Sequence, residues 1–458
     1  MKNITLVGAG SASFGFSTLI DIFYYAEVLQ GSTITLNDVN AESLEHMLRL
    51  AERLVRETGA QLSFKASTDL RTAVAGTDFV VIAVARDRLT TWKQDWDIPL
   101  KYGVKHVLGE NGGPGGLGHT LRSAHLVLEV AKVIEEVAPQ ALVLNFTNPL
   151  TRVCLALNRA TKLRVVGLCH GIGNAYLAAG QVLGYITGKE DKATIREVLG
   201  RRIDIKAAGL NHMTFVYELR DAETGADLYP EFLQRLPEMP PSFRPLARQI
   251  TDSFGLFPSL GDGHMGEYIS FAWETSAMAG YDFNAAAQSA TELRTLITQA
   301  AAGDQSVSER LKHPSGERAI PIIGAVMHGQ NQYEVALNIP NRGSIPGLPE
   351  WAVVEVPGVV GAAGVYGLQV PALPPAITAL LSQQVAIQDR AVEATIHGDR
   401  QAALQALLLD PTINSYQAAT QILDELLTVH STYLPQFAKY VNVESHNVGS
   451  PALFVGRS

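Results

Sequence analysis

A cysteine and a histidine, each at the end of an expected strand, carry the clearest potential for metal chemistry in this sequence. Cys169-His170 follows the apolar strand 164–168, and Asn211-His212 follows the strand 203–210. A thiolate and an imidazole from separate strands can hold one divalent cation and leave coordination positions open for substrate oxygens. Taken singly, Cys169 can equally be a small buried apolar residue and His212 a core histidine, so the spacing leaves both interpretations open.

A glycine turn after the first strand could bind phosphate. The run GAGSASFG, residues 8–15, lies between the strand 4–7 and a helix, where backbone amides can hold a pyrophosphate, although Ser13 replaces the usual third glycine. Asp38 lies 28 residues after Gly10, where a carboxylate can bind a ribose diol, so the pair favours NAD over NADP. The alternative is a flavodoxin-like turn with a capping acid and no nucleotide. The expected cofactor contacts are Gly8, Gly10, Ser11, Phe14 and Asp38.

Short β-branched apolar runs alternate with amphipathic stretches through the first 170 residues. The runs are 4–7, 33–36, 79–82, 142–144 and 165–168, and the amphipathic stretches include 41–58 and 120–137. This alternation predicts an α/β fold with a Rossmann-like, doubly wound, mostly parallel sheet, whose ligands bind beyond the carboxyl ends of the strands. After residue 200 the alternation is lost, and 374–434 is mostly helical in pattern. We therefore expect an NAD-binding domain over 1–200 and a helix-rich α+β domain for substrate and oligomer contacts over 201–458.

Composition excludes several classes of function. The 458 residues are 47% hydrophobic and 18% charged, as in folded, soluble proteins, and the net charge of −9 disfavours nucleic-acid and anionic-membrane partners. No apolar run reaches the roughly 18 residues of a membrane helix, and no signal sequence precedes the first strand. The two cysteines are too few for a disulfide framework. We expect a cytoplasmic protein with a small-molecule partner.

Five motifs in order along the chain together resemble the NAD- and metal-dependent glycosidases of glycoside hydrolase family four. They are GAGS at 8–11, NFTNP at 145–149, GLCHG at 167–171, GLNH at 209–212, and the segment from FP at 257–258 to EY at 267–268. Later segments, including SGE at 315–317 and VEVP at 354–357, resemble the same family. The resemblance covers nearly the whole chain, and it implies a homodimer or homotetramer.

The resemblance implies a redox route to glycoside hydrolysis, which differs from the two-carboxylate route of most glycosidases. NAD⁺ takes hydride from C3 of the sugar, a base removes the acidified C2 proton, and the aglycone leaves C1 by elimination. Water then adds to C1, and the same NADH reduces the ketone. A divalent metal, Mn²⁺ in most members, binds the C2 and C3 oxygens and stabilises the enolate.

The same resemblance assigns roles to individual residues. The metal ligands correspond to Cys169 and His212, and the substrate-orienting asparagine to Asn148, whose alternative role is to form the turn before Pro149. The C2 base corresponds to Asp262, which could equally lie in a plain glycine-flanked turn, or to Tyr268.

Other predicted contacts complete the site. They are Asn145 for the cofactor, Asn211 for the substrate, and His170 as an additional catalytic residue next to the thiolate. The segment 110–116, with Glu110 and Asn111 as substrate contacts, resembles the family's flexible loop by the nicotinamide.

The sugar is predicted to be an unphosphorylated α-glucoside, α-galactoside or α-hexuronide. The run CHGIGN at 169–174 differs from the pattern of members that cleave 6-phosphosugars. Arg86 and Arg88 could clamp a C6 carboxylate, or could belong to a surface ion cluster with Asp87.

Three alternatives remain open. One is an NAD-dependent dehydrogenase of the lactate/malate type, whose N-terminal half would have the same pattern. A second is a 6-phospho-α-glucosidase. The third is a nucleotide-sensing module that has kept the fold and lost the chemistry.

Overall fold

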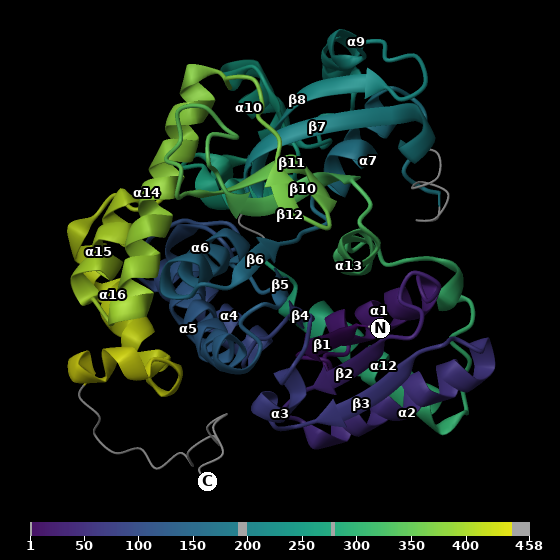
Figure 1. The fold of residues 1–458 in the computed structure, drawn as a ribbon. Coiled ribbons are helices and arrows are strands. Elements are labelled where there is room, and N and C mark those ends of the chain that lie inside the picture. The colour runs from purple at the N-terminus through teal and green to yellow at the C-terminus, as the bar shows by residue number, and fades with distance from the viewer. Residues whose placement is uncertain (1, 191–198, 276–279, 442–458) are drawn as a thin grey trace.

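The framework of the protein is one continuous mixed β-sheet. The computed structural model describes residues 2–190, 199–275 and 280–441, and its sheet has 12 strands (Figure 1). The first six in chain order pair in parallel, and the later ones pair antiparallel. From one edge to the other the strands are β3 (Ser63–Ser67), β2 (Thr33–Asn37), β1 (Asn3–Val7), β4 (Phe79–Ile82), β5 (Leu142–Asn145), β6 (Arg164–Gly167), β10 (Gln332–Pro340), β11 (Val353–Gly361), β7 (Ile203–Leu210), β8 (Met213–Asp221) and β9 (Phe257–Pro258), with β12 (Gly364–Gly367) paired to β11.

Helices connect the parallel strands and enclose the sheet. The C-terminal helices α14, α15 and α16 lie beside α5 and α6 (Figure 1). Of the helices described, none has both the length and the apolarity to cross a membrane. The bounds are α1 (Phe14–Tyr24), α2 (Ala41–Thr58), α3 (Leu70–Val74), α4 (Arg88–Lys101), α5 (Gly113–Val137), α6 (Leu150–Ala160), α7 (Gly173–Val182), α9 (Tyr229–Arg235), α10 (Pro245–Phe254), α11 (Asp262–Met265), α12 (Phe283–Ala302), α13 (Ala319–His328), α14 (Pro375–His397), α15 (Arg400–Leu409) and α16 (Tyr416–Val429).

The predicted Rossmann-like α/β fold is confirmed, and local sequence explains its elements. All four residues of β4 and of β5 are buried, as expected for apolar strands covered on both faces. The apolar residues of α2 recur on one face, the Asn40 side chain accepts the Ser43 N–H at 2.9 Å, and Gly59 ends the helix with φ 70°. The sequence analysis missed β3 because Ser63–Ser67 is an edge strand without a buried residue and has no apolar pattern.

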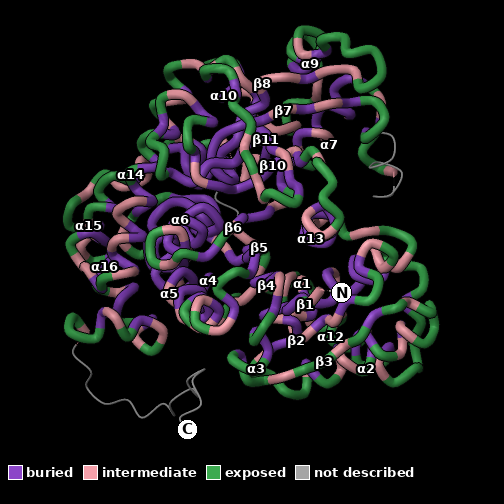
Figure 2. The backbone as a smooth tube through the Cα atoms, viewed as in Figure 1, coloured by how far each residue is buried: buried purple, intermediate pink, exposed green. Residues whose placement is uncertain are grey.

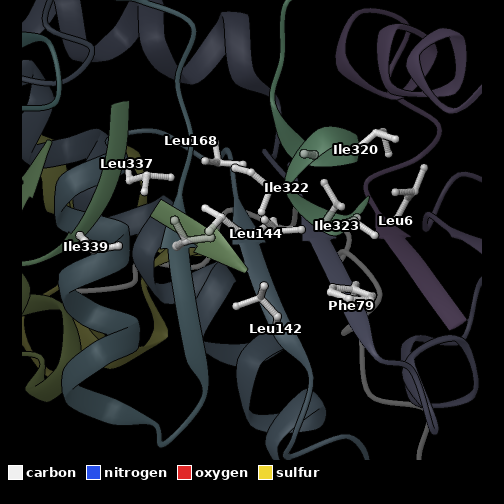
Figure 3. Packing of buried hydrophobic residues seen from close by; sticks show 14 of the residues in the cluster. Leu6, Phe79, Leu142, Leu144, Leu168, Ile320, Ile322, Ile323, Leu337 and Ile339 are labelled. Atoms are coloured by element: carbon white, nitrogen blue, oxygen red, sulfur yellow. The ribbon is translucent and has the colours of Figure 1, made fainter. Parts of the chain in front are cut away.

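The core crosses the predicted domain boundary at residue 200. Helix α13 places Ile320, Ile322 and Ile323 among apolar side chains of the parallel strands, including Leu6 and Phe79 (Figure 3). Figure 2 shows buried backbone continuing from these strands into β10 and β11. The sheet likewise runs without a break from β6 to β10. The division into 1–200 and 201–458 stays a prediction, and the structure shows that the two parts share one sheet and one core.

A buried ionic cluster joins the C-terminal helices to α4 and α5. Asp95 of α4 is fully enclosed, and its carboxylate accepts hydrogen bonds from Arg122 of α5 at 2.8 Å and from His430, just after α16, at 2.9 Å. Because both partners are also buried, each charge depends on the others for its compensation.

Asp95→Asn should destabilise the fold strongly. The substitution leaves the Arg122 guanidinium buried without a counter-charge, so we expect the free energy of unfolding to fall by about 3–5 kcal/mol in urea titrations. Asp97→Asn on the same helix is the matched control, because it breaks only an exposed pair with Lys93 and should cost under about 1 kcal/mol. Equal losses in the two variants would contradict this account of the cluster.

Candidate functional site

The fold brings together the ends of two strands, β6 and β7, that are consecutive in the sequence but separated in the sheet by two other strands. Strands β10 and β11 lie between β6 and β7, and Cys169 comes two residues after β6. His212 lies in the turn after β7, and its Nε2 is 3.6 Å from Cys169 Sγ. The predicted pair of a thiol and an imidazole is therefore present as a contact in the structure.

The turn that carries His212 has a demanding backbone geometry. Asn211 and His212 form the two-residue connection between β7 and β8, whose ends pair Leu210 with Met213. His212 has φ 65°, which is uncommon for a residue with a Cβ. Gly209 has φ 155°, and a Cβ there would lie 2.2 Å from the Met213 carbonyl oxygen. The turn therefore requires glycine at 209 and holds His212 in one orientation.

Burial keeps both groups uncharged before any cation binds. Burial and the neighbouring His264 lower the pKa of His212 to about 3, so its imidazole is neutral at physiological pH. Burial and the nearby Glu355 carboxylate raise the pKa of the Cys169 thiol to about 12. The Nδ1 atom of His212 is buried without a hydrogen-bond partner in the described structure. A neutral imidazole next to a thiol that a metal can deprotonate is a donor set that fits a divalent cation.

A buried acid fixes the position of Asn211. Glu355 of β11 is 2% exposed, and its Oε2 accepts hydrogen bonds from Asn211 at 2.7 Å and from Asn338 of β10 at 2.8 Å. Burial raises the pKa of Glu355, and the two amides partly offset this effect. The side-chain nitrogen of Asn211 is thus occupied, while its Oδ1 has no partner among the described residues. Glu355 was not among the predicted site residues, although an acid within the apolar run VVEVPGVV was a usable signal.

The glycine turn has the shape of a dinucleotide cradle. Gly8 has φ 93°, and a Cβ there would lie 2.1 Å from the backbone oxygen of Ala83, the residue that follows β4. Asp38, at the end of β2, accepts the Gly10 N–H at 2.9 Å. A Cβ on Gly15 would lie 2.2 Å from the Ala9 oxygen, so Gly15 supplies the close helix–turn packing that the usual third glycine provides. The turn and the acid therefore fit NAD as predicted from their residue types.

The remaining predicted cofactor contacts lie around this turn. The Ser11 hydroxyl accepts the Phe14 N–H at 3.3 Å, and the Phe14 ring lies against Phe146 with 4.6 Å between centroids. The Asn145 amide is fully buried and makes two hydrogen bonds within its own turn, so it shapes the turn that precedes Asn148. Asn148 itself is half-buried at the edge of the sheet, before α6.

The predicted flexible loop at 110–116 is wrong in part. Helix α5 begins at Gly113, so only 110–112 lies outside the helix. Pro114 in the first turn favours this start, and the amides of 110–112 donate to the buried Glu267 carboxylate at 2.7, 2.6 and 3.0 Å. The segment is consequently fixed by a specific anion.

Arg88 and Glu110 are paired with each other. Arg88 Nη2 lies 2.9 Å from Glu110 Oε1, and the guanidinium lies 4.9 Å from the Trp92 ring centroid. Burial raises the pKa of Glu110, but Arg88 and the nearby His119, His264 and His212 together outweigh it, so the pKa lies below its usual value. Asn111 is buried next to this pair, and Arg86 is half-buried in the preceding turn. For Arg88 to bind a substrate carboxylate as predicted, its guanidinium would have to leave the carboxylate of Glu110.

The two candidates for the C2 base have different surroundings. Both Asp262 carboxylate oxygens accept backbone amides at the start of α10, from Leu246 at 2.8 Å and Ala247 at 3.1 Å. Tyr268 is buried with its ring against Gly112, and its hydroxyl lies 3.5 Å from the Asn211 carbonyl oxygen. Burial and nearby carboxylates raise the pKa of Tyr268 well above its ordinary value, whereas Arg152 lowers it. The structure thus gives Asp262 a helix-capping position and places Tyr268 next to the His212 turn.

His170 lies away from the buried centre. Its side chain is 68% exposed, and its Nδ1 lies 2.6 Å from Glu317. The structure therefore places it at the rim of the site, paired with an acid from the segment before α13.

Two residues near His212, His264 and Glu267, were not predicted as site residues. The ring of His264 lies 4.3 Å from that of His212 between centroids. Within the described part of the chain, His212, His264 and Glu267 form a group whose potential ligand atoms lie within 4.8 Å of one another. The i, i+3 spacing of His264 and Glu267 ahead of Tyr268 was the available signal.

Comparison with known proteins identifies the class to which this fold and site belong. Residues 3–177 match the model of the family 4 glycosyl hydrolases, and residues 207–413 match the model of the C-terminal domain of that family. The chain therefore belongs to family 4 of the glycosyl hydrolases.

Individual relatives extend the comparison over nearly the whole chain. An α-glucosidase of Erwinia rhapontici is 33% identical over 94% of this chain and 98% of its own, and an α-galactosidase of Rhizobium meliloti is 27% identical over 96% and 90%. A crystal structure of a 6-phospho-α-glucosidase from gut microorganisms, in complex with NAD and Mn²⁺, superposes with a TM-score of 0.80 at 22% identity, covering 95% of this chain and 99% of that one. This last likeness shows the fold.

Mn²⁺ binding should release a proton from the site. Because the Cys169 thiol has a pKa near 12 and only the thiolate is a ligand, the ion must displace that proton throughout the neutral range. We expect the logarithm of the association constant to rise by about one for each pH unit between pH 7 and 9, as measured by titration calorimetry. In Cys169→Ser the affinity should fall at least tenfold and the slope should vanish. A pH-independent affinity in the unsubstituted protein would contradict the assignment.

Proposed function

We propose that this protein is an NAD- and Mn²⁺-dependent α-glycosidase acting on unphosphorylated sugars. The observation that carries the proposal is the contact between Cys169, after β6, and His212, after β7. In the same sheet, the turn between β1 and α1 has the shape of a dinucleotide cradle. The family membership and the relatives that are an α-glucosidase and an α-galactosidase support the reaction class. The 6-phospho-α-glucosidase structure in complex with NAD and Mn²⁺ supports the cofactors.

The chain's residues can hold both groups. Gly8, Gly10 and the N-terminus of α1 would hold the pyrophosphate, and Asp38 would bind the ribose diol. Cys169 and His212 would hold the cation. When bound, NAD supplies reversible hydride exchange with C3 of the sugar, and the cation polarises the oxygens at C2 and C3.

Other residues then position the sugar and move its C2 proton. Asn148 would orient a sugar hydroxyl. Glu110 and Asn111, which we call the polar wall, are two buried polar residues that would also contact the substrate. Tyr268 is the better candidate for the base at C2, because both Asp262 carboxylate oxygens already serve α10. Burial and the carboxylates of Glu267 and Glu110 raise the pKa of Tyr268, so its hydroxyl holds its proton in the resting site, while Arg152 favours the phenolate.

The unphosphorylated substrate is the finer part of the proposal. The α-glucosidase and α-galactosidase relatives at 33% and 27% identity support it, as does the sequence that follows Cys169. Arg88, already paired with Glu110, is less suited to a phosphate than an unpaired arginine would be. We further propose a cytoplasmic location, since the site requires Cys169 to stay reduced, and a homo-oligomer, which the family resemblance alone supports.

A panel of p-nitrophenyl glycosides tests the function. With NAD⁺, Mn²⁺ and a thiol, we expect release of nitrophenol from α-glucosides, α-galactosides or α-galacturonides, slower release from their 6-phosphates, and no net NADH. Omitting NAD⁺ or adding EDTA should reduce the rate at least a hundredfold. Steady NADH production from hydroxy acids would instead support the dehydrogenase, and nucleotide binding without any turnover would support the sensing module.

Tyr268→Phe and Asp262→Ala separate the two candidate bases. Hydrolysis in D₂O by the unsubstituted enzyme should place deuterium at C2 of the product sugar. We expect Tyr268→Phe to lower kcat by about 10²–10⁴ and to abolish the exchange at C2. Asp262→Ala should cost about 1 kcal/mol of stability through the lost cap and retain the exchange. The reverse pattern would make Asp262 the base.

A further inference from the structure

Glu267 lies between two parts of the site that the proposed mechanism uses separately. Its side chain is completely buried, and its two carboxylate oxygens have different partners. Oε2 accepts the three successive backbone amides of Glu110, Asn111 and Gly112, whereas Oε1 lies 3.4 Å from His264 Nδ1. One side chain therefore contacts both the segment with the polar wall and the histidine next to His212.

The first oxygen fixes the backbone of the polar wall. Three consecutive N–H groups that converge on one oxygen form an anion-binding concavity, and here the anion comes from the chain itself. A Cβ on Gly112 would lie 2.7 Å from the Glu267 carbonyl oxygen, so the two segments are also in close backbone contact. These amides are consequently closed to a carboxylate or phosphate of a substrate, and the orientation of Glu110 and Asn111 depends on Glu267.

The second oxygen fixes the tautomer of His264. A hydrogen bond from His264 to a carboxylate oxygen needs the proton on Nδ1, and the 3.4 Å contact with Glu267 favours this tautomer. In the neutral ring Nε2 then has the free lone pair. Histidines that bind metals commonly donate their other N–H to a carboxylate in this way. The His264 ring lies next to His212, and its potential ligand atom is within 4.8 Å of the potential ligand atom of His212.

We propose that His264 is a third protein ligand for the cation held by Cys169 and His212, and that Glu267 is a positioning residue that orients His264 and fixes the 110–112 segment. Two protein ligands alone make a loose site, and catalytic sites commonly have three with open positions left for substrate. A His264 ligand completes that number with 37% of its side chain exposed, so a substrate oxygen can still reach the ion. This inference rests on the proposed function for the identity of the ion.

Two substitutions at Glu267 separate its two contacts. Glu267→Gln keeps an oxygen for the three amides, but its NH₂ donates to Nδ1 and leaves the proton on Nε2. Glu267→Ala removes both contacts. We expect Glu267→Gln to weaken Mn²⁺ binding by about 10–100-fold, with the glycoside KM at saturating Mn²⁺ changed less than threefold. Glu267→Ala should weaken Mn²⁺ binding equally and also raise that KM about tenfold.

His264→Ala provides the independent variant if Glu267 variants fail to fold, because its half-exposed side chain can be removed with little loss of packing. It should weaken Mn²⁺ binding by the same factor as Glu267→Gln, and Glu267→Gln added to it should have no further effect on the affinity. Mn²⁺ binding is measured by electron paramagnetic resonance on the NAD-saturated protein without substrate at pH 8.

Asp399→Asn is the matched control, since Asp399 is a carboxylate that caps α15 through two backbone amides outside the site. It should leave both the Mn²⁺ affinity and KM unchanged. Unchanged Mn²⁺ affinity in His264→Ala would overturn the ligand assignment, and equal effects of Glu267→Gln and Glu267→Ala on KM would overturn the positioning role. Either result leaves the proposed function intact, whereas glycoside cleavage without NAD and Mn²⁺ would remove that function itself.

Discussion

The site depends on the buried carboxylate of Glu355 between the amides of Asn211 and Asn338. Glu355 belongs to β11, Asn338 to β10, and Asn211 to the turn after β7. The Glu355 carboxylate therefore connects the hairpin turn to the two strands that separate it from β6. A buried acid with two amide donors is costly to disturb, because either amide would be left without its partner. Asn211 is the neighbour of His212 in the turn, so this acceptor anchors the turn that carries the imidazole.

The chemistry of the site follows from how little charge its metal-binding groups carry. A protonated thiol and a neutral imidazole can be buried together without repulsion, and a cation then brings the charge that makes the thiolate. The surrounding carboxylates are largely occupied. Glu110 is paired with Arg88, Glu267 accepts three amides, and Glu355 holds two side-chain amides. These three carboxylates therefore have structural partners, which agrees with the proposal that the phenol of Tyr268 acts at C2.

The sequence predicted the fold and the central pair because both depend on local signals. Buried parallel strands have continuous apolar runs, and the topology places Cys169 and His212 at strand ends, whereas their assignment as a pair of metal ligands came from the family resemblance. The polar edge strand β3 lacked any such signal. The start of α5 at Gly113 was missed because four of the residues from 112 to 116 are glycines, and a contact with Glu267, more than 150 residues away, decides the conformation there. The choice between Asp262 and Tyr268 as the base came from the family resemblance and stays a prediction. The two amide partners of Asp262 in α10 could not be inferred from its flanking glycines.

The left-handed backbone at His212 has a consequence for how this protein can evolve. Glycine or asparagine adopts this left-handed conformation at a lower energy than histidine does. A chain selected only for thermal stability would tend to acquire one of them at position 212. The proposed role of the imidazole as a metal ligand opposes that tendency, so the hairpin retains a residue whose backbone conformation is less favourable. In homologues that lose the proposed glycosidase reaction, selection no longer keeps histidine at this position. Histidine or its replacement at residue 212 would then indicate whether a homologue retains the reaction.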